Sequence, residues 1–259
     1  MQRYFVTPPQ LQGGTFAITG DDARHIVKVM RMKPDDKIYV SDGQSNSGIA
    51  VIREITADTV LVELEKLLES SSEPAWSVTI AQSLPKGDKM ELVIQKGTEI
   101  GACAFAPFQS ERMIVQYDAR KEAKRLERWG KIAKEAAEQC HRDRIPAIEG
   151  VRSWKELLQL IGSFDLALFC YEEEGKEHEG LGLRAAVQHW LTAGVRQGDK
   201  PSILLIAGPE GGFTGREAAE AEQAGARLVG LGRRILRAET AGIVGLTCLM
   251  YESGEMGGV

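Results

Sequence analysis

The chain has 259 residues, 43% of them hydrophobic and 27% charged, and a formal net charge of −5. This composition is typical of a soluble globular protein with one or two domains, and no apolar stretch is long enough to cross a bilayer. The four cysteines lie far apart without metal-ligand spacing, so we expect buried, reduced thiols and no metal site. The amino-terminal residues carry no export signal, which predicts a cytoplasmic protein without a membrane partner.

The basic residues are unevenly distributed along the chain. Residues 84–146 hold 13 Lys and Arg against 10 Asp and Glu, whereas acidic residues are in excess on both sides of this segment. A local patch, rather than the net charge, decides whether a protein binds phosphate. The middle segment therefore permits a nucleic-acid surface without demonstrating one.

The first part of the chain is predicted to form mainly short strands. Apolar runs or alternating hydrophobicity mark four of them, at residues 15–18, 37–40, 49–55 and 60–64. Between the first two, Ile26, Val27 and Met30 have the spacing of a helix from Asp21 to Met30. A polar, proline-ended run of glutamates and serines then has the composition of a linker. We therefore predict a small β-barrel or sandwich domain at residues 1–72.

After the linker, strands alternate with helices, which predicts a mostly parallel sheet covered on both faces. The predicted strands are residues 77–81, 102–107, 165–171, 202–207 and 227–231. The predicted helices include residues 89–101, 121–140 and 239–251, and two that begin at capping boxes of the Ser/Thr-x-x-Glu form, at Ser153 and Thr214. We place this α/β domain at residues 73–259.

Two loops follow predicted strands at the edge where ligands bind in parallel sheets. The first is Gly-Pro-Glu-Gly-Gly at residues 208–212, whose glycines let the backbone approach a ligand closely. It has neither the P-loop pattern nor the dinucleotide-binding fingerprint, so binding of adenosine by backbone groups is favoured over binding of phosphate. On its own, the loop is explained equally well as a tight structural turn.

The second loop, residues 231–237, is harder to explain as structure alone. It carries three arginines around the apolar pair Ile235 and Leu236. A solvated basic surface does not normally hold two large aliphatic side chains in its middle. The pattern favours a loop whose aliphatic residues cover an apolar ligand while an arginine meets an anionic group.

Together the two loops, GPEGG and LGRRILRAETA, resemble the carboxyl-terminal signature of the bacterial ribosomal RNA small subunit methyltransferase E family. Further matches run through the chain: HIVKVMR at 25–31, KGDKME at 86–91, QKGTEIG at 95–101, SER at 110–112 and EQCHR at 138–142. The resemblance implies a PUA-like β-barrel followed by a SPOUT-type α/β domain with a parallel sheet and a carboxyl-terminal trefoil knot. The chain departs from the family pattern at Arg233, where proline is usual, and at His141, where glycine is usual.

By this resemblance the protein would methylate N3 of one uridine of bacterial 16S ribosomal RNA, uridine 1498 in the usual numbering, with S-adenosylmethionine as the methyl donor. Cofactor contacts are then expected from both loops and from nearby strand and helix ends: Tyr171, Ala207, Gly208, Glu210, Gly211, Gly212, Leu231, Gly232, Ile235, Leu236 and Thr240. An aromatic residue at the edge of the core explains Tyr171 at least as well, and a helix-capping role is an alternative for Thr240.

The chemistry of uridine N3 indicates what the enzyme must supply. N3 bears a proton that is engaged in base pairing, so the base must be unpaired before it reacts. Loss of this proton places negative charge on O2 and O4, which a guanidinium stabilises without titrating itself. We predict Arg237 for this catalytic role, with packing or a phosphate contact as equal alternatives. No residue is singled out as a general base.

Contacts with 16S ribosomal RNA, either free or in the assembled small subunit, are predicted for nine basic residues: Arg3, His25, Arg31, Lys86, Lys89, Lys96, Arg112, Arg142 and Arg144. For each of them, solvation of the surface is the alternative role, and His25 could be a packed histidine. The resemblance also implies a homodimer through the knot region. In that case four apolar residues of the last helix lie either in the interface or in the core: Ile243, Leu246, Leu249 and Met250.

Two other classes of function compete with this hypothesis. The first is a non-catalytic protein that binds RNA or assists ribosome assembly, and the second is a metabolic enzyme that binds a different adenine nucleotide. The intact loops argue against the first, because a protein without a cofactor has little need for them. The small β-domain and the basic middle segment argue against the second.

Overall fold

The computed structural model describes residues 1–44, 46–56, 58–68, 72–113, 119–173, 181–194 and 200–256. The chain divides into two compact units, Met1–Glu73 with Lys134–Ile145 and Pro74–Ala133 with Pro146–Val259. The first break lies at the end of the predicted linker, of which residues 69–71 lie outside the described residues. The two domains predicted from the sequence are continuous segments. That Lys134–Ile145 belong to the first unit was therefore not predicted.

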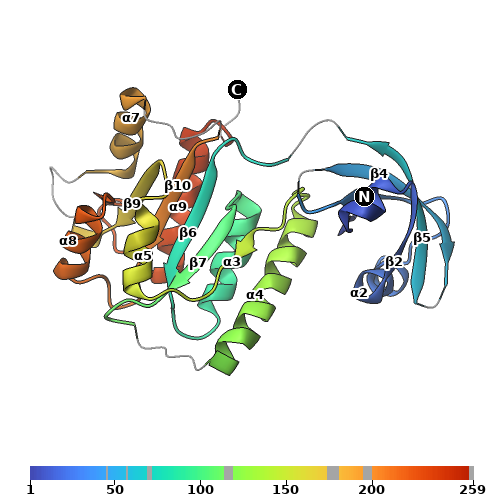
Figure 1. Ribbon diagram of the computed structural model, residues 1–259, viewed down its shortest axis with the longest axis horizontal. Helices are drawn as coiled ribbons and strands as arrows, with labels where there is room; N and C mark the ends of the chain where they lie inside the picture. Colours follow the sequence, from blue (N-terminus) through green and yellow to red (C-terminus); the bar gives the residue numbers. More distant parts are fainter. Residues whose placement is uncertain are drawn as a thin grey trace. The chain divides into compact units, whose positions relative to one another are not determined.

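The first unit is built on a five-stranded sheet (Figure 1). Its elements in chain order are β1 (Arg3–Phe5), α1 (Pro8–Gln12), β2 (Thr15–Thr19), α2 (Gly20–Arg24), η1 (His25–Val29), β3 (Lys37–Ser41), β4 (Ser47–Ile55) and β5 (Thr59–Leu67). The strand order is β1-β3-β4-β5-β2, with β1 and β3 parallel and the other pairs antiparallel. Alternate residues such as Val60 and Val62 enter one apolar core, as the period of two predicts.

The predicted helix from Asp21 to Met30 differs in the structure. The α-helix ends at Arg24, and His25–Val29 forms a π-helix, in which the N–H of Met30 donates to the carbonyl of His25 five residues earlier. The wider turn changes which residues share a face. Ile26 is buried but Met30 is exposed, so the prediction that the two lie on one face of a helix is wrong.

A largely buried carboxyl group, that of Glu138, lies in the last part of α4 (Ala119–Gln139). Burial raises the pKa of Glu138 to about 7, although the Lys134 ammonium 3.4 Å away opposes the shift. In the window between the usual value of 4.5 and 7, the native state keeps a proton that the unfolded chain has lost. The stabilising contribution of this group is therefore complete below pH 4.5 and is lost as the pH rises through 7.

We expect the contribution of Glu138 to the free energy of unfolding to fall between pH 4.5 and 7, and Glu138→Gln to remove that contribution from the pH slope because glutamine cannot ionise. Urea unfolding followed by circular dichroism at several pH values measures both slopes. Glu135→Gln, an exposed position on the same helix, is the matched control and should leave the slope as in the wild type. Equal slopes in all three proteins would show that Glu138 titrates normally.

The second unit contains a six-stranded sheet in which all neighbouring pairs are parallel, in the order β11-β9-β10-β6-β7-β8. Its strands are β6 (Ser77–Ser83), β7 (Ala104–Phe108), β8 (Ala147–Ile148), β9 (Leu166–Cys170), β10 (Ser202–Ala207) and β11 (Arg227–Val229). Its other helices are α3 (Lys89–Ile100), α5 (Trp154–Ile161), α7 (Leu183–Ala193), α8 (Gly215–Gln223) and α9 (Ala238–Glu252). The predicted parallel α/β fold is confirmed, and among the described strands of this sheet only the two-residue strand β8 has no predicted counterpart.

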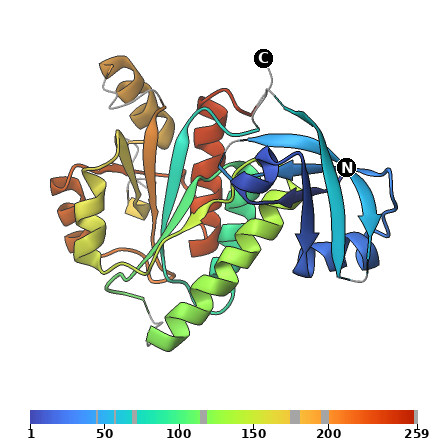
Figure 2. The same cartoon turned by 45° about the vertical axis from the view of Figure 1, so that its right-hand side comes forward.

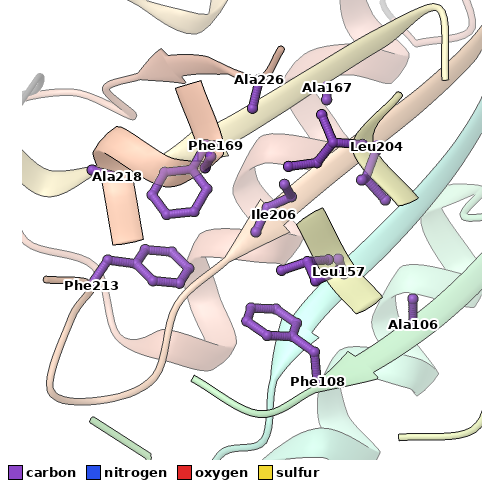
Figure 3. Packing of buried hydrophobic residues seen from close by; sticks show 13 residues of the cluster. Ala106, Phe108, Leu157, Ala167, Phe169, Leu204, Ile206, Phe213, Ala218 and Ala226 are labelled. Atoms are coloured by element: carbon purple, nitrogen blue, oxygen red, sulfur yellow. The ribbon is translucent and has the colours of Figure 1, made fainter. Parts of the chain in front are cut away.

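Helices cover both faces of this sheet. Figures 1 and 2 show α5 and α8 on one side and α3 and α9 on the other. In β10, Leu204 and Ile206 join the core beneath α5 and α8, where Figure 3 shows them among the aromatic side chains. Leu205 faces α9, and Gly245 of α9 allows the close approach, because a Cβ there would lie 2.9 Å from Cδ2 of Leu205.

Two helical glycines differ sharply in their surroundings. A Cβ at Gly97 of α3 would lie 2.7 Å from Cε1 of Phe105, a fully buried ring, whereas a Cβ at Gly130 of α4 would meet nothing within 4 Å. Alanine favours a helix over glycine by about 1 kcal/mol, and overpacking costs about 1–3 kcal/mol.

We expect Gly97→Ala to lower the free energy of unfolding by about 1–2 kcal/mol, because overpacking outweighs the propensity gain. Gly130→Ala should raise it by about 0.5–1 kcal/mol, because only the gain remains. Urea denaturation of the two variants beside the wild type measures both changes. A stabilised Gly97→Ala variant would contradict the close packing of α3 against the sheet.

The structure also bears on the predictions about the cysteines and about the apolar residues of α9. All four cysteines are free thiols, but Cys248 is exposed and the other three are only partly buried, so the prediction that all four are buried is wrong. Leu246, Leu249 and Met250 of α9 are completely buried within this chain and therefore belong to its core. Of the helices in the described ranges, none is both long and apolar enough to span a membrane.

Candidate cofactor-binding site

A cavity of about 400 Å³ lies beyond the carboxyl ends of β9, β10 and β11, within the size range of small-molecule sites. The two predicted loops form most of its wall. The predicted residues that line it are Tyr171, Gly208, Glu210, Gly211, Gly212, Leu231, Gly232, Ile235, Leu236 and Arg237. Ala207 and Thr240 do not line it, although each directly neighbours residues that do. The structure thus brings together the two loops at the predicted edge of the sheet.

The first loop is anchored in the core by the residue that follows it, Phe213. The ring of Phe213 is buried, and its centroid lies 4.1 Å from that of Phe169 on β9 (Figure 3). A Cβ at Gly208 would lie 2.9 Å from Cε2 of Phe213, so glycine is needed where the loop begins. Gly212, at φ 67°, closes the turn by donating its N–H to the carbonyl of Pro209 at 3.0 Å.

A buried amide, Gln82, also holds this loop. Its Nε2 donates to the carbonyl of Gly208 at 3.2 Å and to that of Ser83 at 3.1 Å. Neither Gln82 nor Phe213 was predicted from the sequence as a site residue. A polar residue in a buried strand, close to its carboxyl end, was the available signal for Gln82, because such a side chain must find partners in the protein.

The second loop leaves polar and apolar groups open to the cavity. Gly232 has φ 104°, and a Cβ there would meet nothing within 4 Å. Ile235 is 71% exposed, which is unusual for a large aliphatic residue. Arg237 is the N-cap of α9, and its carbonyl accepts the N–H groups of Thr240 and Ala241 at 2.9 and 3.0 Å. The backbone of Thr240 thus belongs to the first turn of α9, but Arg237 is the N-cap and no side chain caps this helix, so the capping alternative for Thr240 is not borne out.

Other charged groups reach the cavity from outside the loops. Arg112 donates from Nη1 to the carbonyl of Gly211 at 3.2 Å. The preceding residue is held by buried Glu217, whose Oε1 accepts the N–H of Glu111 at 2.8 Å. Burial raises the pKa of the Cys170 thiol, which also lines the cavity, to about 12, so this thiol is protonated in neutral solution.

Lys89 lies on the cavity wall between two carboxylates. Its Nζ is 2.9 Å from Oε1 of Glu210 and 3.3 Å from Oε2 of Glu239, and the N–H of Lys86 donates to the same Glu210 oxygen at 3.0 Å. Although burial opposes ionisation, these bonds hold the pKa of Glu210 below its usual range. The hydrogen bond to Glu210 raises the pKa of Lys89.

Two of the predicted RNA contacts are buried side chains that already have carboxylate partners. Arg3 and Arg142 are only 5% and 4% exposed, and each forms an ion pair inside the first unit, Arg3 with Asp143 and Arg142 with Glu73 at 2.5 Å. A buried guanidinium with a carboxylate partner is not available to a phosphate.

The other RNA candidates are distributed differently. His25 packs against Tyr4, with Nδ1 3.0 Å from the phenol oxygen, which favours the packed alternative. Lys96 is partly buried and bonded to Glu99 at 2.8 Å. Apart from Lys89, the remaining candidates for RNA contacts are exposed: Arg31, Lys86, Arg112 and Arg144.

Family models match most of the chain. A model described as an RNA methyltransferase domain matches residues 71–250, and one described as an RNA methyltransferase PUA domain matches residues 18–65. With the parallel sheet, the small β-domain and the two-loop cavity, these matches define an RNA methyltransferase with an amino-terminal PUA domain.

Individual relatives narrow the class further. Ribosomal RNA small subunit methyltransferase E of Bacillus subtilis (strain 168) is 40% identical over 256 residues, 98% of this chain and 97% of that protein. The protein of this name from Neisseria gonorrhoeae, solved bound to S-adenosyl methionine, has a TM-score of 0.81 and 28% identity over 97% of this chain and 98% of that one. A methyltransferase from Legionella pneumophila, solved with the same cofactor, has a TM-score of 0.79 and 27% identity over 96% and 97% of the two chains.

The chain belongs to the ribosomal RNA small subunit methyltransferase E family. The predicted fold class, a SPOUT-type α/β domain behind a PUA-like β-domain, is confirmed. Membership argues against the metabolic enzyme that competed with this hypothesis.

Proposed function

We propose that this protein methylates N3 of one specific uridine of 16S ribosomal RNA, with S-adenosylmethionine as the methyl donor. The observation that carries the proposal is the cavity in which the two glycine-rich loops meet beside Arg237. The names of the curated relatives support the small-subunit RNA as substrate, and the gonococcal relative supports the cofactor. N3 of the uridine follows from the family resemblance. Work on ribosomal RNA would take place in the cytoplasm.

The cavity has the features that S-adenosylmethionine needs. Gly212 and Gly232 leave open space where any other residue would project a Cβ, so backbone groups of both loops can reach the adenosine. Ile235 and Leu236 would supply apolar surface for the adenine ring, and Tyr171 lines the cavity just after β9. When bound, the cofactor supplies a methyl group that its sulfonium charge makes electrophilic.

The chain's own contribution to the chemistry is alignment and charge stabilisation. Holding the nucleophile about 3–3.5 Å from the methyl carbon supplies much of the acceleration. As N3 gives its proton to solvent water, the charge that develops on O2 and O4 needs a hydrogen-bond donor that is already in place. The guanidinium of Arg237 lines the cavity, and within the part of the chain that the structure describes it has no hydrogen-bond or ion-pair partner. It is therefore available to the uracil oxygens.

A thermal-shift experiment tests the cofactor. S-adenosylmethionine and its demethylated product should stabilise the protein, by about 2.7 kcal/mol at a hundred times the dissociation constant, whereas NAD and ATP should not. Stabilisation by NAD or ATP alone would return the metabolic enzyme to consideration. No stabilisation by any of the four would favour a non-catalytic RNA-binding protein.

We also propose that the exposed basic residues contact RNA: Arg31, Lys86, Arg112 and Arg144. Each phosphate contact releases counterions, so the affinity for RNA should fall steeply as salt rises. Filter binding at several salt concentrations measures the slope. An affinity that does not change with salt would remove this surface from the proposal.

The homodimer is likewise a proposal. Because Leu246, Leu249 and Met250 are core residues, a partner could meet only the remaining faces of α9, where Tyr251 is exposed and Ile243 is partly buried. Light scattering on the purified protein gives the mass directly, and a monomer at working concentration would contradict the dimer.

A further inference from the structure

Lys89 occupies a position where a lysine is electrostatically disfavoured. It is the first residue of α3, directly after the N-cap Asp88. The amino-terminal end of a helix carries partial positive charge, so an ammonium there is repelled and a carboxylate is attracted. A lysine at this position therefore needs compensation from elsewhere in the fold.

The compensation comes from two carboxylates that lie far from Lys89 in the sequence. Glu210 and Glu239 lie 2.9 and 3.3 Å from its Nζ, and the side chains of Lys89, Glu210 and Glu239 are 30%, 26% and 12% exposed. Partial burial reduces the screening by water and salt that makes most surface pairs weak. The three charges form one cluster, which we call the Lys89 bridge.

The bridge joins the two parts of the cavity wall. Glu210 lies in the first loop, where the N–H of Lys86 also donates to its Oε1. Glu239 lies in the first turn of α9, two residues after Arg237, whose carbonyl accepts the hydrogen bonds that begin this helix. The ammonium therefore fixes the separation between the loop that would hold the cofactor and the helix end that presents Arg237.

We propose that Lys89 is a positioning residue: by bridging Glu210 and Glu239 it aligns the cofactor loop with Arg237 for methyl transfer. This inference rests on the proposed function and deepens it. It replaces the RNA contact predicted for Lys89 from the sequence. One ammonium with two carboxylates forms a cluster of net negative charge, which does not attract a phosphate.

Four variants separate the two arms of the bridge. Lys89→Met keeps the aliphatic stem and removes the charge, Lys89→Arg keeps the charge, and Glu210→Gln and Glu239→Gln each remove one arm while keeping the shape. Calorimetry gives the dissociation constant for S-adenosylmethionine, and single-turnover methylation of small-subunit RNA gives the rate. Lys131→Met, an exposed lysine of α4 that pairs with Glu127, is the matched control and should match the wild type in both measurements.

The expected pattern is a split between binding and rate. Glu210→Gln should weaken cofactor binding about tenfold with a smaller effect on rate, because it frees the loop. Glu239→Gln should slow the reaction by up to about a hundredfold with little change in binding, because a displaced group near the reacting atoms is costly. Lys89→Met should show both defects, and Lys89→Arg should recover most of each. A merely structural role would not divide in this way.

Other outcomes overturn the inference. Wild-type binding and rate in Lys89→Met would show that the bridge positions nothing. Weaker RNA binding with a shallower salt dependence, and an unchanged cofactor affinity, would make Lys89 a phosphate contact. If Lys89→Met fails to fold, identical defects in Glu210→Gln and Glu239→Gln would likewise contradict the proposal. Failure of the wild type itself to bind S-adenosylmethionine would instead contradict the proposed function.

Discussion

Replacement of Arg237 by alanine should slow methyl transfer by about 10²–10³-fold, the usual loss when one donor to a developing oxyanion is removed. The affinity for S-adenosylmethionine should stay close to that of the wild type, because the guanidinium would act on the uracil oxygens and not on the cofactor. The fold should also persist, since Arg237 caps α9 through its backbone and makes no side-chain capping bond. Single-turnover kinetics and calorimetry on the same preparation measure both quantities.

Neighbouring arginines make this test specific. Arg234 also lines the cavity and is exposed, so Arg234→Ala shows which guanidinium meets the uracil. Arg237→Lys keeps the charge but loses the planar fork of donors and should recover only part of the rate. Arg128→Ala, an exposed arginine of α4, controls for charge removal in general. Full activity in Arg237→Ala with loss in Arg234→Ala would transfer the role to Arg234.

Removal of the Asp143 carboxylate should cost the first unit about 3–5 kcal/mol, the usual penalty for leaving a buried charge without its partner. Asp143 forms an ion pair with Arg3 and also accepts the N–H of Ser72 at 2.8 Å. Although burial opposes ionisation, these contacts hold the pKa of Asp143 below its usual range, so it is charged in neutral solution. Asp143→Ala would leave the Arg3 guanidinium buried and unpaired.

Urea unfolding measures the total loss, and hydrogen exchange locates it. Protection should fall in β1, which contains Arg3, and in β3, which pairs with it. Glu63→Ala breaks the half-exposed ion pair with Arg53 in the same unit and should cost less than about 1 kcal/mol. Similar losses in both variants would contradict the structural role assigned to Arg3, and its predicted contact with RNA would then deserve a second test.

Local signals in the sequence predicted much of the fold. The capping boxes at Ser153 and Thr214 form as predicted, because a cap is made within four residues of chain. The strands of the second unit follow from continuous apolar runs bounded by polar turns. The edge of the sheet that carries the site followed from the order of strands and helices, because parallel strands place all their carboxyl ends together.

Long-range partners left no such signal. Arg3 and Asp143 are 140 positions apart in the chain, and no periodicity predicts that they pair. The same holds for the Lys89 bridge and for the approach of Gln82 to Gly208, 126 positions away. The π-helix was missed because Ile26, Val27 and Met30 fit an ordinary α-helix. A trefoil knot has no periodic signature in the sequence, so the knot was predicted from the family resemblance alone.

The central claim is methylation of N3 of one uridine in 16S ribosomal RNA, and primer extension tests it most directly. A methyl group on N3 blocks the pairing face of the base, so reverse transcriptase stops there. RNA from a strain that lacks this gene should lose one stop, at the methylated uridine, and the wild-type gene, but not Arg237→Ala, should restore it. An identical pattern of stops with and without the gene would contradict the account.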